Sequence, residues 1–262
     1  MLKKLLLALV AIPVLVILAI MIAFLQGNGQ GVAHFPLNPR PAAVTAEDDA
    51  GVLIFGASRN TGFDVAEILA ARGTKVTAFV RAQSNTGDLE KLGVPLAYGD
   101  ALDMPSVERA FAEKQYSAVV TTIGCIGCNP KPDYLGNKNI FDAAKAAGVR
   151  RVILITTIGA GDSYDAAPLP ARQFLKEMLP LKTQAEDHLK SLGLDYTIIR
   201  PGGLKTAAPT GRAFLSEDRE TSGLITRADL AGLIVAALDD PNTIGKTLAA
   251  IDEDFRFPFD LF

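Results

Sequence analysis

A turn of small residues lies between an apolar run and an amphipathic run. It reads Gly56-Ala57-Ser58-Arg59-Asn60-Thr61-Gly62. If a strand precedes the turn and a helix follows it, unpaired backbone N–H groups and the positive end of the helix dipole meet at one point. Gly56 and Gly62 then let the main chain approach a bound group closely. The turn predicts a site for the pyrophosphate of a dinucleotide; the alternative is a loop that needs glycine only for its conformation.

Arg81 directly follows the second predicted strand, over residues 75–80. Domains that select NAD usually have an acidic residue there, which binds the ribose hydroxyls and would repel a 2′-phosphate. A guanidinium instead forms charge-assisted hydrogen bonds to that phosphate, and Arg59 could close over it from the turn. We therefore expect NADP(H) to be preferred over NAD(H). The alternative is that both arginines are solvated surface charges.

A sheet must position these residues, and strand-like and helix-like runs alternate from Gly51 onward. Several strand-like runs are apolar on both faces, which is typical of a parallel sheet covered by helices. The predicted strands are 52–55, 75–80, 95–98, 118–123, 152–157, 196–200 and 247–251. The predicted helices are 62–72, 106–113, 137–147, 180–192 and 227–238. The fold class is therefore α/β, a Rossmann-type doubly wound parallel sheet over residues 51–252.

Further motifs follow the glycine turn. They are FVR at 79–81, GDALD at 99–103, NIFDAA at 139–144, ITTIGAG at 155–161, KTQAE at 182–186, DYTIIRPGG at 195–203 and RADLA at 227–231. In this order they resemble the atypical short-chain dehydrogenase/reductases, in particular the NmrA-like and flavin-reductase-like NAD(P)H-binding group. The resemblance implies strand order 3-2-1-4-5-6. It also implies cofactor contacts by Asp100 and Ala101 near the adenine, and by Thr122, Ile123, Gly124, Thr156, Pro201, Gly202 and Gly203 along the nicotinamide side.

The turn departs from the family pattern at one place. Members usually carry a third glycine where this chain has Arg59 and Asn60. Asparagine is the residue other than glycine that best accepts a left-handed backbone. We therefore expect the turn to keep its shape.

Lys182 resembles the lysine of the Tyr-x-x-x-Lys pair with which short-chain dehydrogenases oxidise alcohols. That lysine lowers the tyrosine pKa, so the phenol can pass a proton while hydride moves. Here Met178 stands four residues earlier, so the acid is missing. Thr157 takes the place of the family's serine and can hydrogen-bond a carbonyl oxygen. We expect Lys182 to hold the nicotinamide ribose; the alternative is a surface lysine.

The missing acid limits the reactions that the site can catalyse. Tyr134 and Tyr164 are candidate substitutes, but neither has a lysine four residues later. A flavin or quinone can take hydride and draw its proton from solvent, so such a small-molecule acceptor needs no dedicated acid. The sequence thus predicts an oxidoreductase with a planar acceptor. The alternative is a non-catalytic NADPH-binding redox sensor or assembly factor.

Cys125 and Cys128 form a CxxC motif after the fourth predicted strand. Such a motif is typical of a redox pair or of half a zinc site. The chain has no other cysteine and only two histidines, so no metal site is expected. Pro130 and Pro132 delay any helix, unlike the arrangement around a thioredoxin-like pair. We expect ordinary loop cysteines; a thiol-redox role is the alternative.

Residues 5–25 form an unbroken apolar run. At about 1.5 Å per residue it is long enough for a hydrocarbon layer of about 30 Å. It predicts a single N-terminal transmembrane helix within an anchor at 1–25, joined by a flexible linker at 26–50 to the domain, with an aromatic tail at 253–262. A cleaved signal peptide is the alternative.

Two arguments about the side of the membrane conflict. Lys3 and Lys4 precede the apolar run and favour export of the domain. Nicotinamide coenzymes, however, are replenished in the cytoplasm. We therefore expect a single-pass membrane protein whose domain faces the cytoplasm.

Composition excludes two classes of protein. The 262 residues are 49% hydrophobic, which excludes intrinsic disorder. The net charge is −3 and the basic residues are scattered. Because nucleic-acid binding relies on clustered Lys and Arg, no nucleic-acid partner is expected.

Overall fold

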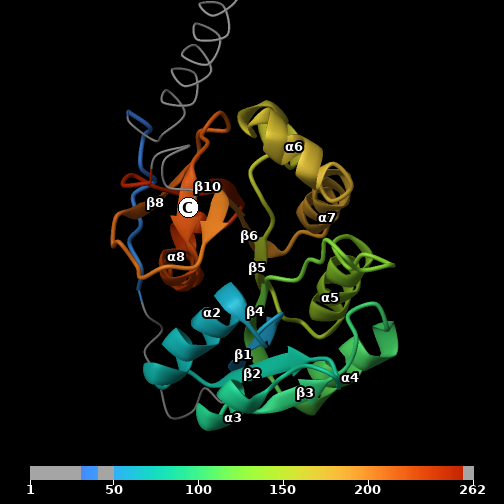
Figure 1. Ribbon diagram of the computed structural model, residues 1–262. Coiled ribbons are helices and arrows are strands. Elements are labelled where there is room, and N and C mark those ends of the chain that lie inside the picture. Colours follow the sequence, from blue (N-terminus) through green and yellow to red (C-terminus); the bar gives the residue numbers. More distant parts are fainter. Residues whose placement is uncertain (1–30, 41–49, 256–262) are drawn as a thin grey trace, which may run out of the picture.

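The strand-like runs from Gly51 onward form one mainly parallel sheet with helices on both faces (Figure 1). The computed structural model describes residues 31–40 and 50–255. The strands of this sheet are β1 (Gly51–Phe55), β2 (Val76–Val80), β3 (Leu96–Tyr98), β4 (Tyr116–Thr121), β5 (Arg151–Ile155), β6 (Asp195–Pro201), β8 (Ala213–Ser216) and β10 (Lys246–Asp252). Their order is β3-β2-β1-β4-β5-β6-β10-β8, and β8 pairs antiparallel with β10. The predicted order of the first six strands is confirmed.

Two layers of helices cover the sheet. On one face α2 (Asn60–Ala71) packs beside α8 (Arg227–Asp239). On the other face α4 (Met104–Glu113), α5 (Leu135–Ala146) and α7 (Leu179–Ser191) pack in a row. The α/β Rossmann part of the predicted fold is therefore confirmed.

Strand β1 shows why the sheet is apolar on both faces. Successive side chains of a strand point to opposite sides. Val52 and Ile54 lie in the core under α2 and α8, whereas Leu53 and Phe55 lie in the core under α4, α5 and α7. All five residues of β1 are buried, as expected for a central strand of a doubly covered sheet.

Several short elements were not predicted. They are α3 (Gly87–Lys91), α6 (Leu169–Leu175), the 3₁₀ helices η1 (Gly161–Ala166) and η2 (Pro241–Thr243), the strand β8, and a two-stranded sheet of β7 (Gly203–Lys205) and β9 (Leu224–Thr226). Each spans seven residues or fewer, too few for hydrophobic periodicity to identify it.

The prediction of a single-pass membrane protein with an N-terminal transmembrane helix is corrected. Within residues 31–40 and 50–255, no helix has the length and apolar character needed to cross a membrane. The longest helices there, α7 and α8, have 13 residues each. At about 1.5 Å per residue they reach about 20 Å, short of a hydrocarbon layer of about 30 Å. The run 5–25 itself lies outside the described residues, as does the predicted tail beyond Phe255.

Residues 31–40, within the predicted linker, lie against the edge of the sheet. The Phe35 N–H donates a hydrogen bond to the Leu215 carbonyl oxygen in β8, at 2.6 Å. The Ser216 hydroxyl donates to the Ala33 carbonyl oxygen at 2.8 Å. The Phe35 side chain also packs against the core under α2 and α8. This segment therefore lies alongside β8, the outermost strand of the sheet.

Candidate functional site

The glycine turn closes tightly between β1 and α2. Gly56 has a φ of +89° and Asn60 a φ of +53°, so Asn60 adopts the left-handed backbone expected of it. A Cβ at Gly56 would lie 2.6 Å from Thr122 Oγ1, and one at Gly62 would collide with the Gly56 carbonyl oxygen. Only glycine fits at these two positions. The surface beside the turn is consequently formed by main chain.

The first turn of α2 leaves backbone N–H groups for a ligand. Arg59, the N-cap residue, is extended and makes no side-chain capping hydrogen bond. The Thr61 hydroxyl is buried without a partner. The order of strands in the sheet reverses between β1 and β4, which is where parallel sheets of this kind bind ligands. The residues present therefore fit the pyrophosphate of a dinucleotide.

Three predicted cofactor residues outside the turn, Arg81, Asp100 and Ala101, lie at the same edge of the sheet. Arg81 directly follows β2, and both Arg81 and Arg59 are exposed. Asp100 and Ala101 come just after β3. The Asp100 carboxylate accepts a hydrogen bond from the Leu102 N–H at 2.9 Å, which fixes this loop. The structure thus brings the predicted adenine and phosphate residues to the carboxyl ends of β1, β2 and β3.

The residues that follow β4 divide into supporting and exposed positions. The Thr122 N–H donates to the Phe55 carbonyl oxygen at 3.0 Å, and the Thr122 hydroxyl donates to the same oxygen at 3.3 Å. Thr122 therefore holds the end of β1. Ile123 packs against the core under α4 and α5. Gly124 is exposed, and a Cβ there would lie 3.1 Å from Lys182 Nζ.

Lys182 is held by Asp133, a residue that sequence reasoning missed. Lys182 Nζ lies 3.0 Å from Asp133 Oδ1, and the two side chains are 13% and 1% exposed. That oxygen has no hydrogen-bond partner, so the contact is an ion pair. The other carboxylate oxygen accepts the Cys125 N–H at 3.1 Å, and the Asp133 carbonyl oxygen accepts from Asn137 Nδ2 at 2.8 Å. A carboxylate this buried needs a compensating charge, so Lys182 is not a solvated surface lysine.

Thr156 and Thr157, after β5, have different surroundings. The buried Thr156 hydroxyl donates to Glu186 Oε1 at 2.7 Å. Its side chain therefore supports a buried ion pair between Glu186 and Arg200. Thr157 is half-buried at the carboxyl end of β5. A hydrogen bond from the same Arg200 lowers the pKa of Asp162 below its ordinary value.

The Pro201-to-Gly203 segment lies beside the loop that carries Thr157. The Ile158 N–H donates to the Pro201 carbonyl oxygen at 2.9 Å. A Cβ at Gly202 would collide with the carbonyl oxygen of Gly223. This wall of the site is therefore also built from closely packed main chain.

No tyrosine is positioned as a partner of Lys182. Met178, four residues before it at the N-cap of α7, is 3% exposed. Tyr134 packs against the core under α4 and α5. Tyr164 is exposed, with the Arg172 guanidinium 5.2 Å from the centre of its ring. Within the described part of the chain, no hydrogen bond joins either phenol to Lys182.

The two cysteines are bonded to each other rather than free. A disulfide joins Cys125 and Cys128, whose Cα atoms are 5.4 Å apart. The expectation of ordinary loop cysteines that behave as small apolar residues is therefore not met. The disulfide lies in the loop that connects Gly124 to Asp133.

Comparisons with known proteins agree with this geometry. A family model described as NAD(P)H-binding matches residues 56–241. ChuY, an anaerobilin reductase from Escherichia coli O157:H7, is 32% identical with a TM-score of 0.73, over 79% of this chain and 99% of that chain. An uncharacterised sugar epimerase of Bacillus subtilis is 30% identical over 184 residues, 68% of this chain and 83% of the relative. Sanguinarine reductase of Eschscholzia californica is 35% identical over 117 residues, 41% of this chain and 40% of the relative. This chain belongs to the NAD(P)H-binding family of atypical short-chain dehydrogenase/reductases and is an NAD(P)H-dependent oxidoreductase.

Proposed function

We propose that this oxidoreductase passes hydride from NADPH to a planar acceptor of the flavin or quinone type. The observation that carries the proposal is the buried Met178 one turn before Lys182. A ketone reductase needs an acid there to protonate the developing alkoxide. An acceptor that spreads the new charge over a ring system can take its proton from water. The site then has only to bind and orient its two ligands.

The chain's own residues divide this work. NADPH, when bound, supplies the hydride. The N–H groups of the turn 56–62 bind its pyrophosphate, and Lys182, fixed by Asp133, donates to a hydroxyl of the nicotinamide ribose. Thr157 donates to an oxygen of the acceptor. The Pro201-to-Gly203 segment lines the nicotinamide pocket.

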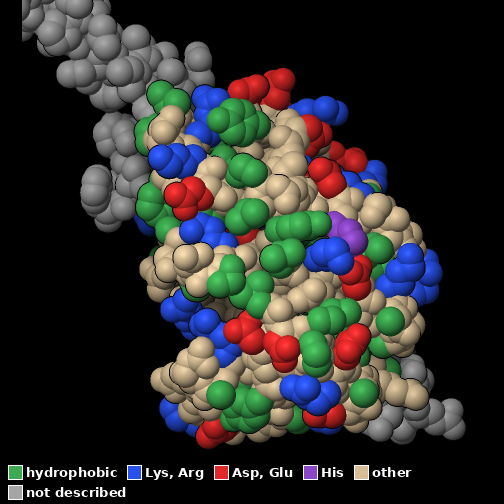
Figure 2. Space-filling view, turned by 90° about the vertical axis from the view of Figure 1, so that its right-hand side faces the viewer, with side chains coloured by type: hydrophobic (Ala, Val, Ile, Leu, Met, Phe, Trp, Pro, Cys, Tyr) green, Lys and Arg blue, Asp and Glu red, His purple; other side chains and the backbone are tan. Residues whose placement is uncertain are grey.

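The surface near Lys182 supports an acceptor with apolar faces. Leu169 and Phe174 are exposed on α6, a helix with no buried residue. Ile126 is exposed in the loop after β4, and an ion pair of 3.0 Å between Lys131 and Glu177 joins that loop to the end of α6. Figure 2 shows hydrophobic side chains exposed among charged ones on the side of the molecule that carries α5, α6 and α7. Exposed apolar groups near a cofactor site favour a flat, apolar ligand.

The acceptor is tested by turnover with NADPH against flavins, quinones, ketones and aldehydes. We expect kcat/KM for the flavins or quinones to exceed that for any ketone or aldehyde by about tenfold or more, the range of effects that specific binding groups produce. Phe174→Ser should raise KM for the acceptor without changing KM for NADPH. Ile244→Ser is the matched control, because Ile244 is also exposed but lies before the amino end of β10, whereas the site is at the carboxyl ends of the parallel strands. Turnover restricted to ketones or aldehydes would contradict the proposal.

Arg81→Asp tests the choice of coenzyme. If Arg81 binds the 2′-phosphate, its replacement removes a charge-assisted hydrogen bond worth about 1.5–3 kcal/mol, or roughly 10- to 150-fold in Kd. We expect the Kd for NADPH to rise by that factor and the Kd for NADH to stay constant or fall. Calorimetry with both coenzymes measures this. Arg109→Asp, at an exposed position on α4, controls for the change in net charge; an unchanged preference in Arg81→Asp would exclude the proposed contact.

A further inference from the structure

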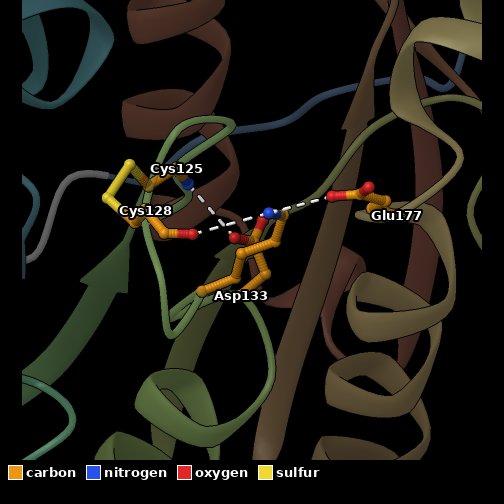
Figure 3. Close-up of a disulfide and its surroundings, with 5 residues drawn as sticks. Cys125, Cys128, Asp133 and Glu177 are labelled. Atoms are coloured by element: carbon orange, nitrogen blue, oxygen red, sulfur yellow. Dashed lines mark hydrogen bonds and ion pairs between the residues drawn. A yellow bond between two sulfur atoms is a disulfide. The ribbon is translucent and has the colours of Figure 1, made fainter.

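The disulfide loop contacts the carboxylate that holds Lys182: Figure 3 shows the hydrogen bond between Cys125 and Asp133. The Cys125 N–H donates to Asp133 Oδ2 at 3.1 Å, while Asp133 Oδ1 faces Lys182 Nζ at 3.0 Å. The buried carboxylate thus has one partner on the disulfide loop and one on α7. A displacement of Cys125 would change the position of the carboxylate and, through it, that of the lysine.

The second cysteine is linked to a different part of the fold. The Cys128 carbonyl oxygen accepts a hydrogen bond of 3.5 Å from Lys131 Nζ, and Lys131 pairs with Glu177 at 3.0 Å, between α6 and α7. The sulfur–sulfur bond therefore connects two contacts that both end on the α6–α7 region. Figure 3 shows both contacts leaving the disulfide loop, one to Asp133 and the other towards Glu177.

The loop is placed where a reductant can reach it. Ile126 and Gly127, between the cysteines, are exposed, and both cysteines are half-buried. A Cβ at Gly127 would meet no atom within 4 Å. Little packing apart from the disulfide therefore holds the tip of the loop.

We propose that Cys125 and Cys128 form a reversible dithiol–disulfide couple whose oxidation state sets the position of Lys182 through Asp133. In the oxidised form the closed ring keeps the Cys125 N–H on the carboxylate. In the reduced form the ring opens, the N–H leaves, and Asp133 no longer fixes the ammonium group. The consequence for coenzyme binding rests on the proposed role of Lys182 at the nicotinamide ribose; the coupling itself does not.

The chemistry needs an external dithiol, such as a protein of the thioredoxin class. A thiolate of the dithiol attacks one cysteine sulfur, the sulfur–sulfur bond breaks, and a mixed disulfide forms. The second thiolate of the dithiol then attacks the mixed disulfide and releases the cysteine that was bonded in it. Two electrons and two protons pass to Cys125 and Cys128, and the dithiol leaves as a disulfide.

Chemical labelling tests the coupling without any coenzyme. The oxidised protein and the protein reduced with dithiothreitol are treated with a limiting amine-acylating reagent, and the modification of each lysine is measured by mass spectrometry. We expect reduction to speed labelling of Lys182 by about tenfold, since it removes a hydrogen bond to the charged group that holds it. Lys138 is the internal reference, because its pairing with Asp142 at 2.6 Å lies within α5. Equal labelling of Lys182 in both states would overturn the proposal, and so would a disulfide that dithiothreitol does not open, as shown by alkylation.

Two variants and one further measurement complete the test. In the double variant Cys125→Ser, Cys128→Ser, Lys182 should be acylated as fast as in the dithiothreitol-treated protein. Dithiothreitol should not change that rate. Glu177→Gln, which removes only the outer ion pair, should keep the redox difference at Lys182. NADPH should bind the reduced form about tenfold more weakly. If Lys182 labelling responds to reduction while neither form binds NADPH, the proposed function fails and the redox coupling stands.

Discussion

Gly62→Ala is expected to weaken NAD(P)H binding by about a hundredfold or more. The added Cβ would collide with the Gly56 carbonyl oxygen and lie 2.7 Å from Thr122 Oγ1. Gly56 directly follows β1, and the Thr122 hydroxyl is hydrogen-bonded to the carbonyl oxygens of Phe55 and Gly56. Because neither neighbour can move away freely, the turn itself must open. A shift of about 1 Å in groups that position a ligand can cost about a hundredfold. Calorimetry with NADPH measures the loss, and a thermal melt shows that the variant is folded.

Gly232→Ala is the matched control for this substitution. Gly232 lies within α8, and a Cβ there would meet no atom within 4 Å. Alanine is the better helix former, so this variant should gain about 0.8–1 kcal/mol of stability and bind NADPH normally. If Gly62→Ala also bound NADPH with unchanged affinity, the turn would not be the pyrophosphate site.

Arg200→Met is expected to lower the free energy of unfolding by about 3–5 kcal/mol. Arg200 is 3% exposed and Glu186 is 0% exposed. Arg200 Nε lies 3.0 Å from Glu186 Oε1, and Nη2 lies 2.6 Å from Oε2. Removing the guanidinium leaves the buried carboxylate with only the Thr156 hydroxyl at 2.7 Å and the more distant Lys190 Nζ at 3.8 Å. Breaking a buried pair by removing one partner costs about that amount. Urea unfolding near neutral pH measures it.

An exposed arginine provides the comparison. Arg150 also makes two hydrogen bonds to a carboxylate, that of Asp195, but the side chains are 63% and 37% exposed. Because solvent screens an exposed ion pair, Arg150→Met should lower the free energy of unfolding far less than Arg200→Met does. Adding Glu186→Leu to Arg200→Met should recover much of the loss, because it removes the unpaired charge. Equal losses in Arg150→Met and Arg200→Met would show that burial does not govern this ion pair.

The sheet and its main helices could be predicted because local pattern and tertiary environment agree along them. Strands such as β1 are apolar on both faces, and helices such as α5 end close to a glycine, here Gly148 with a φ of +78°. The short strand β8 has no such signal. It is defined by antiparallel pairing with β10, more than 30 residues further along the chain. The N-terminal anchor was predicted from hydropathy alone, and no helix in the described ranges supports it.

The site was predictable in its main-chain parts and less so in its side chains. The glycine turn is contiguous in sequence, so its residue types show the close approach of the backbone directly. Asp133 was missed because its partner Lys182 is on another helix, and a single sequence does not show which distant charges meet. Thr156 was assigned to the cofactor by its place in a motif, but its hydroxyl bonds to Glu186. The direction of a side chain at the end of a strand depends on a register that the motif does not specify.

The segment at 31–40 has a practical consequence for anyone shortening this chain. Outermost strands expose unpaired peptide groups that recruit strands of other molecules, and proteins avoid aggregation by covering them. Here the hydrogen bonds to β8 and the stacking of His34 on Phe214, with ring centres 3.8 Å apart, provide such a cover. A truncated protein beginning at Gly51 would lose it and should self-associate. One that begins before residue 31 should stay monodisperse at the same concentration.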